Sequence, residues 1–184
     1  MSTTARIYTR MDEFDDEYIV SVKQAIAADK MADRVLTNLR SLEGIVHGFA
    51  VDQLVHACQT ATRAERAGAD GDLIIGALCH DMAKILTPYN HSSVAAEVVR
   101  PFVREEVTWI VDVHQDFQGK HYYEHLGKDP NAREQYRGHP SFDLAATFAD
   151  DWDQQAFDPA YDTLSLEHFE GRVRERFAHP RFVV

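Results

Sequence analysis

Residues 53–84 of the chain are QLVHACQTATRAERAGADGDLIIGALCHDMAK, and this stretch predicts two successive helices. The first occupies residues 51–67 and is closed by Gly68. Asp70 or Asp72 can cap the second, whose apolar run LIIGALC leads directly into a histidine–aspartate pair. Burying two titratable side chains at the end of so apolar a helix is costly unless they are paired or bind a metal. The stretch therefore predicts a helical fold with a polar site in its interior.

Helical spacing continues through the rest of the chain. Residues 16–43 give one or two helices, within an N-terminal helical region that spans 14–43. Further helices are expected over 92–100, with Ser92 or Ser93 as the cap, and over 104–114. A long aromatic loop follows from about 115 to 140. Two more helices are then expected, one starting from a cap at Ser141 and one over about 165–177. No segment shows the alternation of a strand, so the predicted fold class is all-α.

The bulk composition narrows the function. A length of 184 residues favours one domain over 1–184. The 30 acidic and 19 basic residues give a formal net charge of −11, which argues against nucleic acid and anionic membrane surfaces as partners. No apolar stretch approaches the ~18 residues of a membrane span and no signal core is seen, so a cytoplasmic location is expected. Cys58 and Cys79, without a CxxC motif, are expected to be buried thiols.

Six titratable side chains lie where the helical pattern requires apolar ones. A single histidine of this kind is usually hydrogen-bonded to the backbone, but several on converging helices are typical of metal ligands. Imidazoles and carboxylates without thiolate suit iron, manganese or zinc, and six ligands indicate two ions or one octahedral ion. The six predicted ligands are His56, His80, Asp81, His91, His114 and Asp153.

The order of these residues resembles the H…HD…D signature of the HD-domain superfamily. The two extra histidines are similar to its dinuclear branch, and there the chain looks most like the mixed-valence diiron oxygenases, namely myo-inositol oxygenase and the phosphonate-cleaving oxygenases. QLVHACQTATRAERAGAD (53–70) and LIIGALCHDMAK (73–84) are close to the phosphonate group, and WDQQAFDP (152–159) resembles the last motif of the branch. The resemblance covers about residues 50–160 and implies a single HD-type helical bundle with its metal site in the core.

The resemblance also implies how the ligands divide between two irons. One iron would take His56, His80, Asp81 and Asp153, and the other would share Asp81 and add His91 and His114. Asp150 and Asp151 are close neighbours of Asp153, and the tryptophan–aspartate context alone selects Asp153 as the last ligand.

The implied activity is that of an Fe(II)/Fe(III) oxygenase, which would use O2 to oxidise or cleave a small hydroxylated substrate that could be anionic. Lys84 matches a lysine that contacts substrate in the inositol enzyme. Gln59, on the face of His56, could contact substrate, orient a ligand or pack in the core. Lys120 could belong to a lid or to a solvated loop.

Three positions depart from the family patterns. Val46 and Phe49 stand where the phosphonate enzymes carry a Tyr-x-x-Glu element, and Phe157 stands where the inositol enzyme has a lysine, so neither known substrate follows. The main alternative is a metal-dependent phosphohydrolase acting on a nucleotide or another phosphate ester, with Mn or Zn in place of iron. A third alternative is a nucleotide-binding regulatory or adaptor domain. The sequence predicts no oligomeric state.

Overall fold

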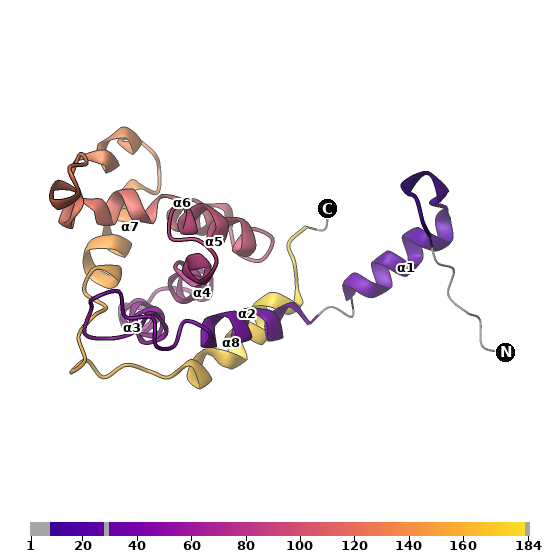
Figure 1. Cartoon of the computed structure of the whole chain (residues 1–184), viewed down its shortest axis with the longest axis horizontal. Coiled ribbons are helices and arrows are strands. Elements are labelled where there is room, and N and C mark those ends of the chain that lie inside the picture. Colours follow the sequence, from indigo (N-terminus) through magenta and orange to yellow (C-terminus); the bar gives the residue numbers. More distant parts are fainter. Residues whose placement is uncertain (1–7, 28–29, 183–184) are drawn as a thin grey trace. The chain divides into compact units, whose positions relative to one another are not determined.

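The computed structural model describes residues 8–27 and 30–182, and every regular element within them is a helix. The predicted all-α class is therefore confirmed. The chain divides into two compact units, Met1–Met31 and Ala32–Val184, which are described separately (Figure 1). One domain over 1–184 stays a prediction. No helix in the described residues has the length and apolar character needed to cross a bilayer.

The smaller unit contains the short helix η1 (Met11–Glu13) and the helix α1 (Asp16–Ala27). Acidic side chains occupy the first turn of α1, where they interact favourably with the helix dipole. The ring of Phe14 stacks on that of Tyr18 with centroids 3.5 Å apart. None of the predicted site residues lies in this unit.

Helices α3 (Gln53–Arg66) and α4 (Gly71–Cys79) of the larger unit are the predicted pair, and they pack against each other. Asp52 caps α3 and Asp70 caps α4, each by accepting hydrogen bonds from backbone amides of the first turn. Apart from its first residue, all of α4 is buried. A helix that is apolar and buried all round lies at the centre of a bundle, so the histidine–aspartate pair that follows it is also central.

Helices α5 (His91–Val99) and α6 (Glu105–Gln118) pack against each other and against α4. Helices α4 and α6 lie close together at Gly76, where an added Cβ atom would lie 2.6 Å from Cγ1 of Val107. Because any larger side chain would force the two helices apart, this glycine sets the spacing between two helices that both lead to predicted ligands.

The chain from α7 (Phe142–Thr147) continues without a break into a π-helical segment, η6 (Phe148–Asp153). Segment η6 packs against α3 and α6. Four side chains along this stretch lie at helical spacing and are buried: Phe142, Ala145, Ala149 and Trp152. A π-helical turn is rare, and its wider turn changes the direction in which the following side chains point. This affects the direction of Asp153, the last residue of η6.

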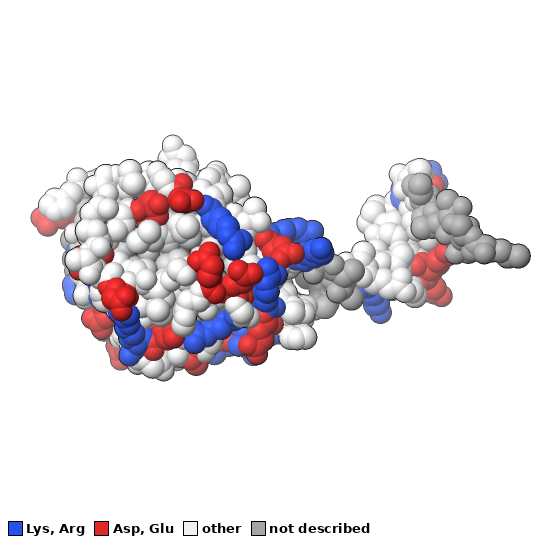
Figure 2. Space-filling model, turned by 90° about the horizontal axis from the view of Figure 1, so that it is seen from below, with Lys and Arg blue, Asp and Glu red and all other residues white. Residues whose placement is uncertain are grey.

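Helix α8 (Leu166–Ala178) lies beside α2 (Met31–Arg40) at the bottom of the larger unit in Figure 1. Figure 2, seen from below, shows basic and acidic side chains side by side on this face. Arg174 of α8 pairs with Asp33 at 2.6 Å, and Arg176 pairs with Asp72 at 2.9 Å. The positive charge of each of these two arginines is therefore paired with the negative charge of a carboxylate.

Some local predictions are wrong. Helix α5 begins at His91, so Ser92 and Ser93 lie inside it, and the Oγ atom of Ser93 donates to Asp112 at 2.7 Å. The position of Ser141 was predicted correctly, since it is the N-cap residue of α7, although its side chain makes no capping hydrogen bond. Helix α6 continues beyond 114, and the remaining predicted loop contains three short helices, η3 (Gly119–His121), η4 (Tyr123–Leu126) and η5 (Ala132–Tyr136).

Candidate metal centre

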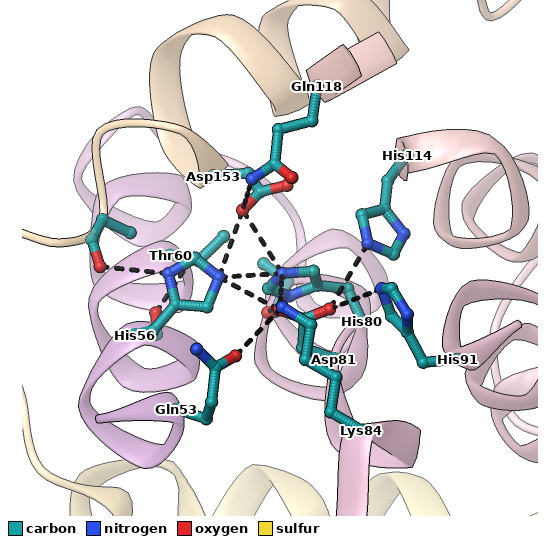
Figure 3. A network of polar contacts seen from close by, with 12 residues as sticks. Gln53, His56, Thr60, His80, Asp81, Lys84, His91, His114, Gln118 and Asp153 are labelled. Atoms are coloured by element: carbon teal, nitrogen blue, oxygen red, sulfur yellow. Dashed lines mark hydrogen bonds and ion pairs between the residues drawn. The ribbon is translucent and has the colours of Figure 1, made fainter. Parts of the chain in front are cut away.

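The six predicted ligands meet in one buried cluster (Figure 3). They are His56 of α3, His80 and Asp81 directly after α4, His91 at the start of α5, His114 of α6, and Asp153 at the end of η6. The most exposed of the six, His91, is 5% exposed. Three overlapping groups of three ligands place their nitrogen and oxygen atoms within 4.8 Å of one another. The geometry therefore suits metal ligation.

Each imidazole is oriented by a hydrogen bond between its Nδ1 atom and a backbone carbonyl oxygen. The carbonyls are those of Ala156 for His56 (3.0 Å), Ala77 for His80 (2.8 Å), Pro88 for His91 (3.2 Å) and Val111 for His114 (2.6 Å). Because a carbonyl oxygen can only accept, each Nδ1 must donate, which leaves the Nε2 lone pair of the neutral ring free. The Nε2 atoms all face the carboxylates of the cluster.

Asp81 lies between the imidazoles, and its two oxygens face different pairs of them (Figure 3). The Oδ2 atom lies 3.3 Å from Nε2 of both His56 and His80. The Oδ1 atom lies 3.1 Å from Nε2 of His91 and 3.5 Å from Nε2 of His114. One carboxylate thus separates two sets of ligand atoms, as an aspartate shared by two ions would.

Asp153 joins the first of these sets. Its Oδ1 atom lies 3.2 Å from Nε2 of His56 and 3.4 Å from Nε2 of His80. The carboxylate of Asp150 forms ion pairs elsewhere, and Asp151 is exposed. Of the three neighbouring aspartates, the structure brings the one in the tryptophan–aspartate context into the cluster.

The cluster contains more hydrogen-bond acceptors than donors. Oδ1 of Asp81 and Oδ2 of Asp153 are buried without any hydrogen-bond donor. The Nε2 atoms of His56 and His80 lie 3.2 Å apart, with a lone pair on each neutral ring. Buried lone pairs and negative charges at such distances repel one another unless a cation lies among them. The donor set of imidazole nitrogens and carboxylate oxygens therefore fits metal ions.

The burial and the charges of the cluster also shift the pKa values of its own side chains. Burial tends to lower the pKa of His80, but the charges of Asp81 and Asp153 outweigh it and raise this pKa to about 10. For His114 burial dominates and lowers the pKa. Burial opposes ionisation of Asp81, yet the positive charges of Lys84 and His80 hold the pKa of Asp81 well below its usual range. The ionised carboxylates thus attract positive charge to the imidazole nitrogens.

Lys84 lies at the edge of the cluster. Its Nζ atom forms an ion pair with Oδ2 of Asp81 and donates to Oε1 of Gln53 at 3.0 Å. The side chain is 19% exposed, so it lies between the buried ligands and solvent. The ion pair places Lys84 at the candidate metal centre, while its contact with substrate stays a prediction.

Gln59 and Lys120 are not brought into the cluster. The amide of Gln59 donates to the carbonyl oxygen of Asp158 at 2.9 Å and to Thr163 at 3.0 Å, and it accepts from the backbone N–H of Asp158 at 3.1 Å. These bonds hold the chain after η6 against α3, which agrees with the core-packing alternative for Gln59. Lys120 is half exposed and lies 3.5 Å from the carboxylate of Asp150.

Two glutamines at the cluster are absent from the predicted set. Gln118 donates from Nε2 to Oδ1 of Asp153 at 2.9 Å, and Gln53 is fully buried against Lys84. Gln53 comes three residues before one ligand histidine, and Gln118 comes four residues after another. Both therefore lie on a ligand-bearing helical face, a signal that the 3.6-residue period could have supplied.

An aromatic stack covers His56. The ring of Phe157 lies 4.1 Å from the imidazole with an interplanar angle of 8°, and Phe49 stacks on Phe157 at 3.9 Å. Phe49 is about half exposed. Two of the three positions that depart from the family patterns thus form one apolar wall beside a predicted ligand.

The comparison with known families agrees with this geometry. The HD domain family matches residues 54–155, which is more than half of the chain and includes all six predicted ligands. No curated protein matches the chain.

Proposed function

Because this chain belongs to the HD-domain family, we propose that it is a dinuclear iron oxygenase, which uses O2 to oxidise or cleave a small hydroxylated substrate. The family and the buried cluster together indicate a metal-dependent enzyme. The iron pair, the oxygen chemistry and the small-molecule substrate are the further steps that we propose.

The division of ligands around Asp81 carries this proposal. Its Oδ2 atom shares one region with His56, His80 and Asp153, and its Oδ1 atom shares another with His91 and His114. The two sets adjoin, since His80, His114 and Asp153 also form one group. A single ion on one side of Asp81 would nevertheless leave the donors on the other side unused. Two ions that share Asp81 would use every donor of the cluster.

The donor chemistry supports iron, with manganese or zinc as the alternatives. All the ligand atoms are nitrogen or oxygen, which suit these ions. Cys58 and Cys79 are free and buried, and burial raises the pKa of each thiol to about 12. At neutral pH neither cysteine offers a thiolate that would favour a softer metal.

An iron pair would supply the one-electron oxygen chemistry, and the protein groups around it would bind and orient the substrate. His56, His80 and Asp153 are 0% exposed, whereas the side chain of Lys84 is 19% exposed. We therefore propose that substrate reaches the cluster from the side of Lys84 and His91. Lys84 would neutralise an anionic oxygen there, and the buried ligands would exclude bulk water.

The rival function is that of a metal-dependent phosphohydrolase. Hydrolysis of a phosphate ester uses cations around the phosphate, which the metal ions and basic side chains can both supply. Lys84 contacts the cluster, but Lys120 and Arg133 instead pair with Asp150. Among the residues that the structure describes, Lys84 is the Lys or Arg paired with a predicted ligand, and this scarcity of basic side chains at the cluster supports the oxygenase.

Metal analysis and spectroscopy test the proposal. We expect two equivalents of iron per chain, a mixed-valence EPR signal after partial oxidation, and O2 consumption with a hydroxylated substrate. One zinc or manganese ion per chain, with phosphate release from a nucleotide panel, would replace the oxygenase by the phosphohydrolase. A chain that retains no metal would favour the adaptor domain.

A further inference from the structure

We propose that Gln118 is a positioning residue that holds Asp153 in place as a ligand, an inference that rests on the proposed two-ion function. Gln118 lies at the C-terminal end of α6 and donates from Nε2 to Oδ1 of Asp153 at 2.9 Å (Figure 3). Hydrogen bonds of this kind to metal ligands orient them and raise metal affinity.

The need for such a contact follows from the surroundings of Asp153. Its Oδ1 atom faces Nε2 of His56 and His80, and in the neutral form in which both imidazoles would ligate a metal neither can donate from that nitrogen, because each Nδ1 carries the proton. Its Oδ2 atom is buried without a partner. The amide of Gln118 is therefore the hydrogen-bond donor that fixes this carboxylate, and it leaves a second lone pair of Oδ1 free for an ion.

The two carboxylates of the cluster are held by donors of different charge. Lys84, a cation, contacts Asp81, whereas Gln118, a neutral amide, contacts Asp153. A cationic donor offsets part of the charge of its carboxylate, but a neutral amide orients the carboxylate and leaves its full charge for the ion. Gln118 should therefore matter most for the ion on the Asp153 side of the cluster.

The chain after Gln118 is fixed to η6 at a second point. His121 lies 2.8 Å and Arg133 lies 3.0 Å from the carboxylate of Asp150, three residues before Asp153. Gly119 is buried under the ring of Tyr123, where a Cβ atom would lie 2.6 Å from the ring. These contacts hold the end of α6 and η6 together, so the Gln118 amide and the Asp153 carboxylate keep their relative position.

The test compares two substitutions at Gln118 by titration of the metal-free full chain with Mn(II) alone. Gln118→Met keeps the volume without the donor, and we expect one of two Mn(II) ions to bind about 10- to 100-fold more weakly. Gln118→Lys restores a donor but adds a positive charge beside Asp153, so it should bind this ion more tightly than Gln118→Met and more weakly than the unchanged chain. Gln154→Met is the matched control, because the Gln154 amide bonds the backbone carbonyl of Asp150 and not a ligand. Circular dichroism checks that each variant is folded.

The outcomes separate the inference from the proposed function. Equal Mn(II) binding by the unchanged chain and Gln118→Met would overturn the positioning role alone. Equal weakening in Gln118→Met and Gln118→Lys would also overturn it, because packing and not the donor would then matter. No Mn(II) binding by the unchanged chain would overturn the two-ion function together with the inference.

Discussion

The Nε2 atoms of His56 and His80 lie 3.2 Å apart in the interior of the larger unit, and neither can donate a hydrogen bond to the other while both rings are neutral. Without a metal ion a proton can supply the positive charge here, since the pKa of His80 is raised to about 10. When both rings are neutral, as metal ligation requires, the two facing lone pairs repel each other in a medium of low dielectric constant. A cation between or beside them removes this repulsion. Folding stability and ion binding should therefore be coupled in this protein.

Adding metal should raise the unfolding temperature of the chelator-treated protein. At a free Mn(II) concentration of about 100 times the dissociation constant, one bound ion adds about 2.7 kcal/mol to the unfolding free energy. Thermal unfolding followed by circular dichroism, with EDTA and then with Mn(II), measures the shift. His80→Ala should show a much smaller shift, and His125→Ala, at an exposed position, should match the unchanged chain. An equal shift in all three would place the ion outside the cluster.

The shared role of Asp81 predicts that two aspartate substitutions differ in the number of ions that remain. Asp81→Asn removes the bridging carboxylate and should leave neither ion tightly bound. Asp153→Asn should lose one ion and keep the other, because Oδ1 of Asp81 still faces two imidazoles. Elemental analysis after anaerobic loading with Fe(II) counts the ions, with Asp151→Asn as the exposed control. Equal ion content in the Asp81 and Asp153 variants would rule out a shared carboxylate.

The sequence was sufficient to predict the α3–α4 pair and the buried histidine–aspartate cluster because both depend on helical periodicity. His56 and His114 interrupt apolar helical faces, and the pair His80-Asp81 ends a helix that is too apolar to face solvent. Asp153 was distinguishable from Asp150 by its neighbouring tryptophan. The signals of His56, His114 and the His80-Asp81 pair come from burial patterns with a titratable exception, which are strong patterns in a single sequence. The choice of Asp153 among its neighbours instead came from the resemblance of WDQQAFDP to a family motif.

Gln59 and Gln118 show where such prediction stops. Each follows a ligand histidine by one helical turn, yet Gln59 bonds the backbone of residue 158 whereas Gln118 bonds a ligand carboxylate. Both glutamines follow their histidine by one helical turn, so their spacing in the sequence does not distinguish them. The segment that packs against each helix decides which group the amide meets. The π-helical segment η6 was also missed, because its wider turn has no periodic signature of its own in six residues.

The cap of α4 makes a pH-dependent contribution to stability. Burial opposes ionisation of Asp70, but the hydrogen bond from Arg104 and those from the first-turn amides outweigh it and lower the pKa below the usual 3.8. A lowered pKa means that the stabilisation is complete above about pH 4 and is lost as the pH falls through the folded-state value. Asp70→Asn keeps a capping group without the charge.

Urea unfolding of metal-free protein between pH 3 and pH 7 tests this cap. We expect the unchanged chain to exceed Asp70→Asn by about 0.5–1 kcal/mol near neutral pH, since the Arg104 pair is partly exposed to solvent. The difference should begin to fall as the pH drops below about 4 and should be smallest at pH 3. The carboxylates of the cluster do not contribute to this difference, because both proteins contain them. A difference that is constant over this range would show that charge at Asp70 does not contribute.

The contact of Gly76 with Val107 predicts a steric coupling between α4 and α6. In Gly76→Ala the new Cβ atom would lie 2.6 Å from Cγ1 of Val107, which forces a shift in a packed core and should cost about 1–3 kcal/mol of unfolding free energy. Gly171→Ala is the matched control: it lies within α8 with no atom within 4 Å of an added Cβ, so it should stabilise the protein by about 0.5–1 kcal/mol.

Val107→Ala alone leaves a cavity, but combined with Gly76→Ala it removes the clash that the new methyl group creates. Urea unfolding of both single variants and the double variant should therefore show a double variant less destabilised than the sum of the two, by more than the ~0.5 kcal/mol expected of independent sites. Additive losses would mean that the helices separate at Gly76 without involving Val107, and the spacing of the two ligand-bearing helices would then have another cause.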